Sequence, residues 1–147
     1  MNIETVTAGL PPAVPPSIQV RVVLRPLTTV LNPLILRLAG RRHFGMAGAL
    51  SHVGRRSGRP YVTPVGARRA GDVIVIPLTF GNRSDWSMNV LAAGRCTVML
   101  RGQHYDVSVP RLLTRREAGS LIRDAFSLIE RVSFRALGIT QFMRLEI

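Results

Sequence analysis

Short segments of alternating or continuous apolar residues follow one another through the middle of the chain. Most are bounded by glycine-containing or charged turns, and they span residues 44–53, 60–69, 72–79, 95–101 and 103–109. Segments of this length and spacing are typical of antiparallel strands, and the alternation over 141–147 predicts a last one. Pro77, late in the third segment, indicates an edge strand or an early exit from the sheet. The pattern therefore predicts about six antiparallel strands.

Two stretches change from strand-like to helical spacing. Ser84 can cap a mid-chain helix that Gly94 ends, and Asp85 suits the positive end of its dipole. A long late helix is expected from Thr114, which has capping-box spacing to Glu117, as far as Gly138. Strands with helices packed against them predict an α+β, mainly β fold, a small β-barrel of about six strands.

The N-terminal part of the chain follows a different pattern. Four prolines among residues 11–16 predict a flexible, extended leader over residues 1–16, ahead of a single domain over 17–147. Residues 17–39 are apolar with arginines spaced through them, and Asn32 with Pro33 favours a short helix that ends near Gly40. We expect this N-terminal helical segment to pack on the core. The alternative is peripheral membrane contact through residues 17–42.

Composition adds a strong positive charge. The chain has 147 residues, enough for a sizeable core, and a formal net charge of +12. Such a charge suggests an anionic partner, but every basic residue is an arginine, which fits codon bias, so local clustering carries more information. No nucleic-acid motif is visible and few aromatic residues offer stacking surfaces, so nucleic acid is not expected as a partner.

Cysteine and histidine usage excludes other chemistry. Cys96 is the only cysteine, so we expect no intrachain disulfide, and its apolar surroundings predict an inert core thiol. The three histidines lack metal-ligand spacing, so no metal is expected, and His52 should lie in the core or in a site wall.

No apolar run is long enough to span a membrane and no signal peptide is recognisable. Together these observations predict a cytoplasmic protein, with membrane association as an alternative.

The most basic turn of the chain lies between two of the predicted strands. It consists of Arg55, Arg56, Ser57, Gly58 and Arg59, with Gly54 before it and Pro60 after it. Glycine permits close backbone approach, exposed amides can form an anion-binding nest, and arginine binds phosphate or carboxylate through two parallel hydrogen bonds. The turn is therefore either a polyanion site at a hairpin tip or a solvated turn.

A second cluster joins a strand end to a helix start. The strand ends at Leu78 and Thr79, the chain turns at Phe80 and Gly81, and the helix that follows presents free amides at its start. Trp86 and Asn89 are three residues apart and so share a helix face. This face could contact a ligand, or Trp86 could anchor the core.

These clusters, with Thr63, Pro64 and Val65 between them, resemble the deazaflavin-dependent nitroreductase family, split β-barrel oxidoreductases that bind coenzyme F-420. The resemblance covers about residues 44–110 and is carried by residues 54–58 with Pro60, by 63–65 and by 85–94. It implies that the anionic phosphodiester and oligoglutamate tail of the coenzyme is held by the basic turn. The residues implicated are Arg55, Arg56 and Ser57, with Gly58, Arg59, Trp86 and Asn89 nearby.

The resemblance also implies a position for the deazaflavin ring. The ring would be bordered by Thr63, Pro64 and Val65 and by Leu78, Thr79, Phe80 and Gly81. Reduced deazaflavin delivers a hydride, here to a small quinone- or nitroaromatic-like acceptor, which explains why no catalytic residue is evident.

The chain also departs from the family pattern. Tyr61 stands where many members have arginine, and the C-terminal part lacks tyrosines, so nitro reduction itself does not carry over. A non-catalytic F-420 carrier and a split barrel that binds flavin mononucleotide stay open as alternatives, and a homodimer is a further expectation.

Overall fold

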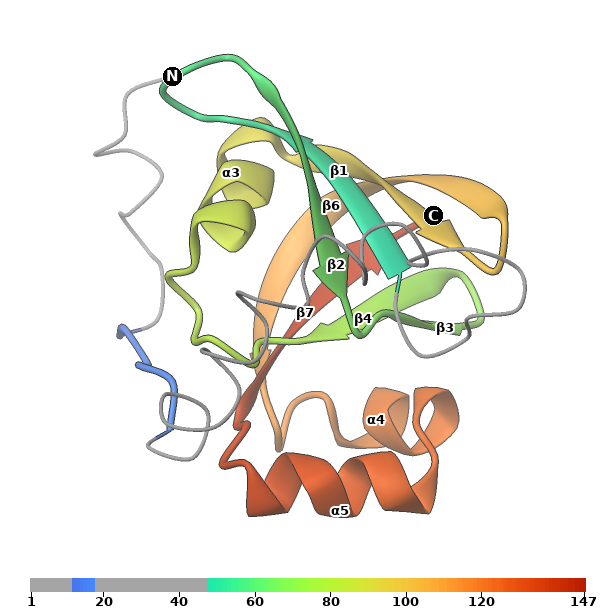
Figure 1. The fold of residues 1–147 in the computed structure, drawn as a ribbon. Coiled ribbons are helices and arrows are strands. Elements are labelled where there is room, and N and C mark those ends of the chain that lie inside the picture. Colours follow the sequence, from blue (N-terminus) through green and yellow to red (C-terminus); the bar gives the residue numbers. More distant parts are fainter. Residues whose placement is uncertain (1–11, 18–47) are drawn as a thin grey trace.

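The computed structural model describes residues 12–17 and 48–147. Its strands form one antiparallel sheet in the order β2-β1-β5-β6-β7-β4-β3. In Figure 1 this sheet is strongly curved, α3 packs beside β1, and α4 and α5 lie beneath β3 and β4. The strands are β1 (Gly48–Val53), β2 (Pro60–Val65), β3 (Arg68–Ala70), β4 (Val73–Pro77), β5 (Arg95–Leu100), β6 (Gln103–Thr114) and β7 (Gln141–Glu146). The helices are α3 (Asp85–Ala93), α4 (Gly119–Ala125) and α5 (Leu128–Ala136).

The expected mainly β fold is confirmed, but the strand count was wrong by one. The segment 60–69 is two strands, because the chain leaves β2 at Val65 and re-enters the sheet as β3 at Arg68. These two strands occupy opposite ends of the sheet order and do not pair with each other in the described part of the chain. The described strands therefore form an open curved sheet of seven strands rather than a closed barrel of six.

Strand β6 is much longer than the predicted 103–109. Its first half pairs with β5 and its second half with β7, and the register shifts between Ser108 and Arg111. Val109 lies at this shift with a φ of 53°, and Pro110, which follows, has no N–H to donate. The shift is a bulge that lets one strand serve two neighbours in succession.

The mid-chain helix agrees with its prediction, and the late helix does not. Gly94 ends α3 in the left-handed conformation (φ 71°), as expected. Ser84, in contrast, donates its hydroxyl to Ser87 Oγ (3.0 Å) rather than capping the backbone. The late helix is interrupted at Phe126, whose extended backbone keeps its ring buried, so that α5 begins afresh after Ser127.

The predicted capping box at Thr114 forms, but it does not begin a helix. The Thr114 N–H donates to the Glu117 carboxylate (2.7 Å) at the end of β6 and braces the turn before α4. A second capping box, between Ser127 and Glu130, starts α5. Gly138 (φ 68°) follows the C-cap of α5, which confirms the expected end point.

Two apolar clusters form the core. The first joins the sheet to α3 through Leu50, Ile76 and Val90, and the second joins the sheet to α4 and α5 through Ile122 and Phe142. Cys96 packs against the first cluster, and burial raises the pKa of its thiol to about 12, which agrees with an inert side chain. Pro77 ends β4 and pairs only with Phe142 of β7, because the described pairs between β3 and β4 stop at Val75. Both the early exit and a locally unpaired edge at Pro77 are therefore confirmed.

The short N-terminal piece that the structure describes is attached to the domain by hydrogen bonds. The Val14 N–H donates to Asn82 Oδ1 (2.8 Å), Asn82 Nδ2 donates to the Pro12 carbonyl (3.1 Å), and the Ser17 hydroxyl donates to the Leu137 carbonyl. Residues 1–11 and 18–47 lie outside the described residues, and with them the short helix at Asn32 and most of the segment 17–42. No helix among the described residues is long and apolar enough to cross a membrane.

Candidate functional site

The basic turn forms the tip of the β1–β2 hairpin, as its sequence suggested. Val53 pairs with Pro60, and the turn is closed by hydrogen bonds from the Gly54 N–H to the Arg59 carbonyl and from the Gly58 N–H to the Gly54 carbonyl, both 2.9 Å. Gly58 has a φ of 67°, and a Cβ atom at Gly54 would lie 2.4 Å from Ser57 Oγ. The left-handed backbone favours glycine at position 58, and a side chain at position 54 would displace the Ser57 hydroxyl.

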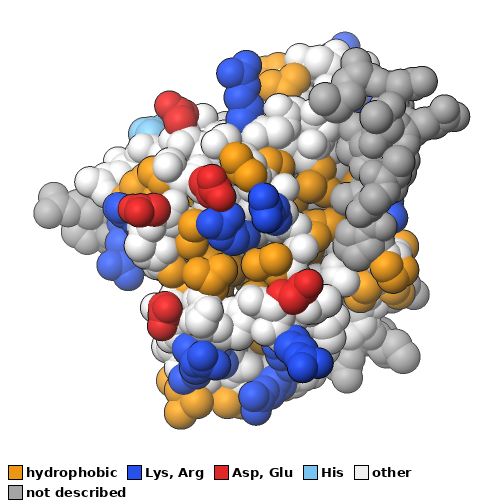
Figure 2. Space-filling view, turned by 180° about the vertical axis from the view of Figure 1, so that it is seen from behind, with side chains coloured by type: hydrophobic (Ala, Val, Ile, Leu, Met, Phe, Trp, Pro, Cys, Tyr) orange, Lys and Arg blue, Asp and Glu red, His pale blue; other side chains and the backbone are white. Residues whose placement is uncertain are grey.

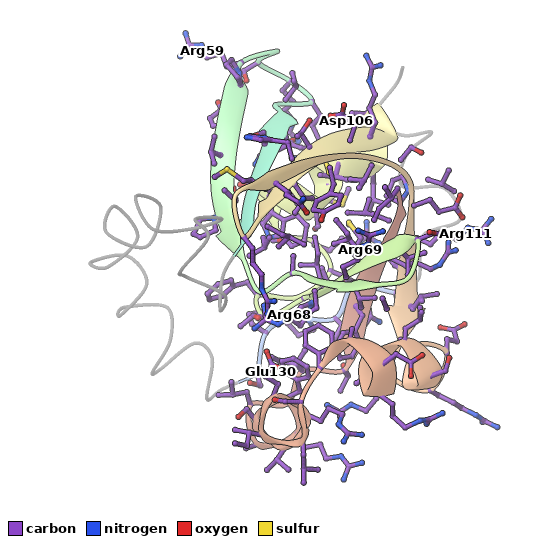
Figure 3. All side chains as sticks on the ribbon, turned by 90° about the vertical axis from the view of Figure 1, so that its right-hand side faces the viewer. Arg59, Arg68, Arg69, Asp106, Arg111 and Glu130 are labelled. Carbon is purple, nitrogen blue, oxygen red and sulfur yellow. The ribbon has the colours of Figure 1, made fainter. Side chains whose placement is uncertain are left out.

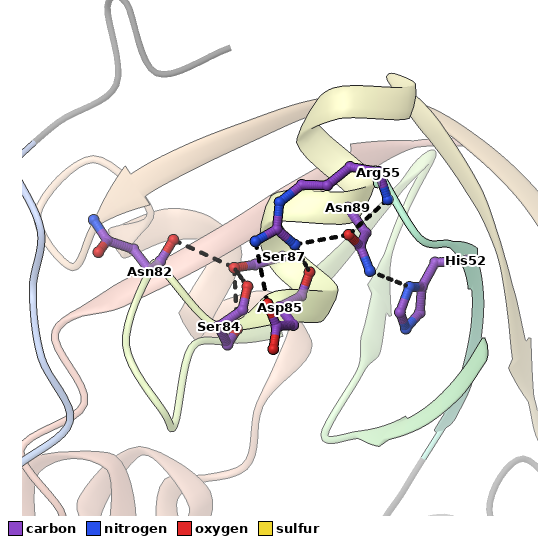
Figure 4. Close-up of polar contacts among 7 residues, drawn as sticks. All are labelled: His52, Arg55, Asn82, Ser84, Asp85, Ser87 and Asn89. Atoms are coloured by element: carbon purple, nitrogen blue, oxygen red, sulfur yellow. Dashed lines mark hydrogen bonds and ion pairs between the residues drawn. The ribbon is translucent and has the colours of Figure 1, made fainter. Parts of the chain in front are cut away.

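Arg55 ties this turn to the start of α3. Its backbone N–H and its Nη1 both donate to Asn89 Oδ1, at 3.0 and 2.8 Å, while Nη2 forms an ion pair with Asp85 at 3.1 Å (Figure 4). The Arg55 side chain is only 17% exposed. Arg55 is thus held within the protein, and its charge is matched by Asp85.

Asn89 extends this network to His52. Because Asn89 Oδ1 accepts from Arg55, its Nδ2 must donate to His52 Nδ1 (3.1 Å). The His52 proton then lies on Nε2 and is donated to Thr63 Oγ1 (3.0 Å). Burial lowers the pKa of His52, an effect that Asp85 partly opposes, so the ring is neutral at pH 7.

A cleft of about 530 Å³ lies between the hairpin and the first turns of α3. Six predicted residues line it, namely Arg55, Arg56, Ser57, Thr63, Trp86 and Asn89. The remaining lining residues, His52, Gly54, Tyr61, Val62 and Asp85, were not among the predicted site residues. Trp86 also packs against the first core cluster, which supports its interpretation as a core anchor, while its contact with a ligand stays a prediction.

The lining residues outside the predicted site set carried some signal, and the expectation that His52 lies in the core or in a site wall is confirmed. His52 occupies an inward position of β1, after the buried Leu50 and between exposed neighbours, so the alternation of the strand directs it towards the site. Tyr61 stacks on His52, with ring centroids 5.8 Å apart, and its hydroxyl is 3.3 Å from Ser57 Oγ. Asp85 is predicted as a helix-start residue and as part of the stretch 85–94 that carries the resemblance, but nothing in its spacing indicates the ion pair with Arg55.

The turn also carries exposed arginines and backbone N–H groups that have no partner among the described residues. Arg56 and Arg59 are exposed and form no ion pair with any described residue, and Arg59 projects from the hairpin tip (Figure 3). The N–H groups of Gly54, Arg55, Gly58 and Arg59 are all donated within the protein. Those of Arg56 and Ser57 have no acceptor in the described part of the chain, so they are available to a ligand.

The residues predicted to border the ring form a separate group. Leu78 is buried in the core, and its N–H donates to the Gln141 carbonyl (3.0 Å). Gly81 (φ 84°) lies directly under the N-terminal piece, since a Cβ atom there would be 2.3 Å from the Val14 carbonyl oxygen. Phe80 lines a second cavity of about 660 Å³ together with residues 13–16 and 83–85.

The two cavities meet at one residue. Asp85 lines both of them. Thr79 is half-buried beside Phe80, while Pro64 and Val65 continue β2 beyond Thr63, outside either lining. The structure therefore gathers six of the predicted residues around one cleft and places Phe80 in the lining of the second cavity. It leaves the other predicted residues outside both linings, namely Gly58, Arg59, Pro64, Val65, Leu78, Thr79 and Gly81. No group of three metal-ligating side chains occurs among residues 12–17 and 48–147.

A curved antiparallel sheet, with a cleft between a basic hairpin turn and the start of a helix, defines a mainly β protein. Residues 39–123, more than half of the chain, match the model of the F-420H(2)-dependent quinone reductase family. The chain belongs to this family.

Solved structures share the fold at low identity. An F-420-H2-dependent reductase (FDR-A) is 13% identical with a TM-score of 0.51, the match covering 69% of this chain and 94% of the other. A structure described as a domain-swapped dimer is 14% identical with a TM-score of 0.53, covering 82% and 99%. These likenesses concern the fold alone. The search of curated proteins gave no match.

Proposed function

We propose that this protein binds coenzyme F-420 with its anionic tail on the Arg56–Arg59 side of the hairpin turn, and that it is an oxidoreductase acting between the reduced deazaflavin and a small organic acceptor of the quinone class. Membership of the family supports the cofactor class. The observation that carries the proposal is the pair of uncompensated arginines, Arg56 and Arg59, beside a cleft of about 530 Å³.

The chemistry of the turn fits an anionic tail. Charge-assisted hydrogen bonds from guanidinium groups and backbone amides are the strongest contacts available to phosphate and carboxylate groups. Arg56 and Arg59 supply the charge, while the N–H groups of Arg56 and Ser57 supply directed donors. Asp85, whose side chain is 91% exposed, carries a negative charge at the start of α3 and so disfavours an anion there. The tail should therefore lie along the hairpin rather than over the helix end.

Arg55 has a positioning role in this proposal. Its bonds to Asn89 and Asp85 hold the turn in one conformation before a ligand arrives, which lowers the ordering cost of binding. Neutral His52 keeps Thr63 oriented at the cleft wall.

The reaction itself needs few protein groups. When bound, the deazaflavin supplies the hydride chemistry. The half-buried ring of Trp86 gives the cleft an apolar wall that excludes water, and the loop 78–81 would border the reacting end. An acceptor needs only to be positioned there.

A fluorescence titration with oxidised F-420 tests the binding step. We expect Arg56→Gln to weaken binding about 10- to 100-fold, because a charged hydrogen bond contributes about 1–3 kcal/mol. Arg95→Gln, at an exposed position of β5 outside the cleft, is the matched control and should keep the wild-type affinity. Equal affinities of the two variants would exclude the turn as the tail site.

Two further measurements separate the alternatives. Tight binding of flavin mononucleotide without binding of F-420 would replace the proposed coenzyme. Binding of reduced F-420 without its oxidation, across a panel of soluble quinones, would make the protein a carrier rather than an enzyme.

A further inference from the structure

A pocket surrounded by arginines lies between α4 and α5. It has a volume of about 250 Å³ and is lined by Arg115, Arg123, Arg131 and Arg135, with Phe134 and Phe142 among its apolar neighbours. Figure 2 shows arginine side chains gathered over the part of the molecule where α4 and α5 lie. This end lies away from the hairpin tip and α3 (Figure 1), so the pocket is separate from the cleft described above.

The positive charge of this pocket is not compensated by its surroundings. No carboxylate lines it. The acidic side chains of α5 and of the turn before α4 are engaged elsewhere, since Glu130 pairs with Arg68 at 2.5 Å and Glu117 accepts from Thr114. Asp124 of α4 is exposed, does not line the pocket and forms no ion pair with any described residue. Arg131 Nε is buried and has no hydrogen-bond partner among the residues that the structure describes. Four like charges around one small cavity repel each other, and an anion bound between them would remove the repulsion and give Arg131 a partner.

An exposed apolar strip runs beside the pocket. Leu128, Ile129 and Val132 of α5 are 66, 79 and 55% exposed. Leu128 and Val132 are four residues apart, and Val132 and Arg135 three, so the apolar strip and the arginine rim adjoin each other on one helix surface. Helices with an apolar face flanked by arginines bind at the interface of anionic membranes.

We propose that this end of the molecule docks on an anionic phospholipid bilayer. The arginine pocket takes a lipid phosphate, and Leu128, Ile129 and Val132 enter the region between headgroups and acyl chains. A second copy of the chain is a poorer occupant, because a two-fold contact through this surface would press one arginine rim against the other. A soluble phosphate would fill the pocket but leave the apolar strip in water.

Flotation of the full chain with vesicles tests the proposal. Vesicles of phosphatidylcholine containing about 30% phosphatidylglycerol should carry the protein, and pure phosphatidylcholine vesicles should not. The double variant Arg131→Gln/Arg135→Gln should bind about 25-fold more weakly, since each arginine near an anionic surface contributes roughly a factor of five. Leu128→Ser/Ile129→Ser, which keeps every charge, should also lose binding.

The matched control is Arg95→Gln/Arg101→Gln, which removes the same charge from exposed positions on and just after β5. It should float like the wild type, and thermal unfolding should show that all variants fold. Flotation that survives both α5 variants would overturn the proposal and assign any membrane contact to another part of the chain. Absence of wild-type flotation would also overturn it, and inorganic phosphate that stabilised the protein in that case would mark the pocket as a site for a soluble anion.

Discussion

Asn89 is the residue on which the geometry of the cleft depends. Its oxygen accepts two hydrogen bonds from Arg55 and its nitrogen donates to His52, so one amide joins the hairpin turn, α3 and β1. The sequence placed Asn89 on the same face as Trp86, next to a ligand. The structure adds that its oxygen is occupied by the protein. A direct contact between Asn89 and a coenzyme tail stays a prediction.

The protonation of His52 should make the stability of the protein depend on pH. Burial holds the pKa of His52 below its ordinary value of 6.5. As pH falls through 6.5 the unfolded chain takes up a proton that the folded chain does not, so the free energy of unfolding falls over the range below pH 7. A proton on Nδ1 would also break the bond from Asn89.

Urea denaturation between pH 8 and pH 5 measures this effect. His52→Gln should reduce the loss of stability on acidification. His104→Gln, at an exposed position, is the control and should leave the wild-type slope in place. Identical slopes for wild type and His52→Gln would contradict the assignment.

The three arginines of the turn illustrate what the sequence could predict about the site. Their clustering indicated an anion site, and the structure places Arg56 beside the cleft. Their spacing could not distinguish Arg55 from the others, because its partners Asp85 and Asn89 lie 30 and 34 residues away in the chain. The hydrogen bonds and the ion pair that hold the turn could therefore be found only through the fold.

Among the elements, β6 was the hardest to predict. Alternation identified its first half, but Pro110 and the apolar pair Leu112 and Leu113 interrupt the pattern, so the second half was not recognised as strand. The late helix failed for a related reason. Its apolar spacing continues across Phe126, but burial of that ring against Phe134 and Phe142 takes precedence over helical continuity.

The bulge in β6 contains a residue poorly suited to its backbone. Val109 has a φ of 53°, a left-handed conformation that is costly for a β-branched side chain, and it is 41% exposed. Asparagine tolerates this conformation. Val109→Asn should therefore stabilise the protein by about 0.5–1 kcal/mol in thermal or urea unfolding.

Val53→Asn provides the comparison for this substitution. Val53 is similarly exposed, at 50%, but lies in the regular strand β1. It has no strain to relieve, so asparagine there should give no stabilisation. Equal effects at the two positions would show that the bulge is not strained.

At the scale of the whole molecule, Asn82 fastens the N-terminal piece to the domain. Its side chain is fully buried, accepts from the Val14 N–H and donates to the Pro12 carbonyl. Asn82→Ala leaves both backbone groups without these partners and should cost about 1–3 kcal/mol of stability. It should also expose residues 12–17 to limited proteolysis. Ser120→Ala, at an exposed position of α4, is the control for both measurements.

Element types were more predictable than their arrangement. The alternating segments and the glycine turns located the strands, and Gly94 and Gly138 marked the ends of two helices correctly. The sheet order could not be read from the chain, because β7 inserts between β4 and β6 through contacts that join residues far apart in sequence. A self-associated form, as in the domain-swapped neighbour, stays a prediction for this chain.

The link between β2 and β3 determines how the sheet is completed. These strands lie at opposite ends of the hydrogen-bonded order, yet only Gly66 and Ala67 separate them in the chain. The two edges of the curved sheet are thus joined by the covalent chain and not by hydrogen bonds between strands. The length of this linker limits how far apart the two edge strands, β2 and β3, can lie. Residues inserted between Val65 and Arg68 should therefore let these edges move apart while every existing strand pair keeps its register.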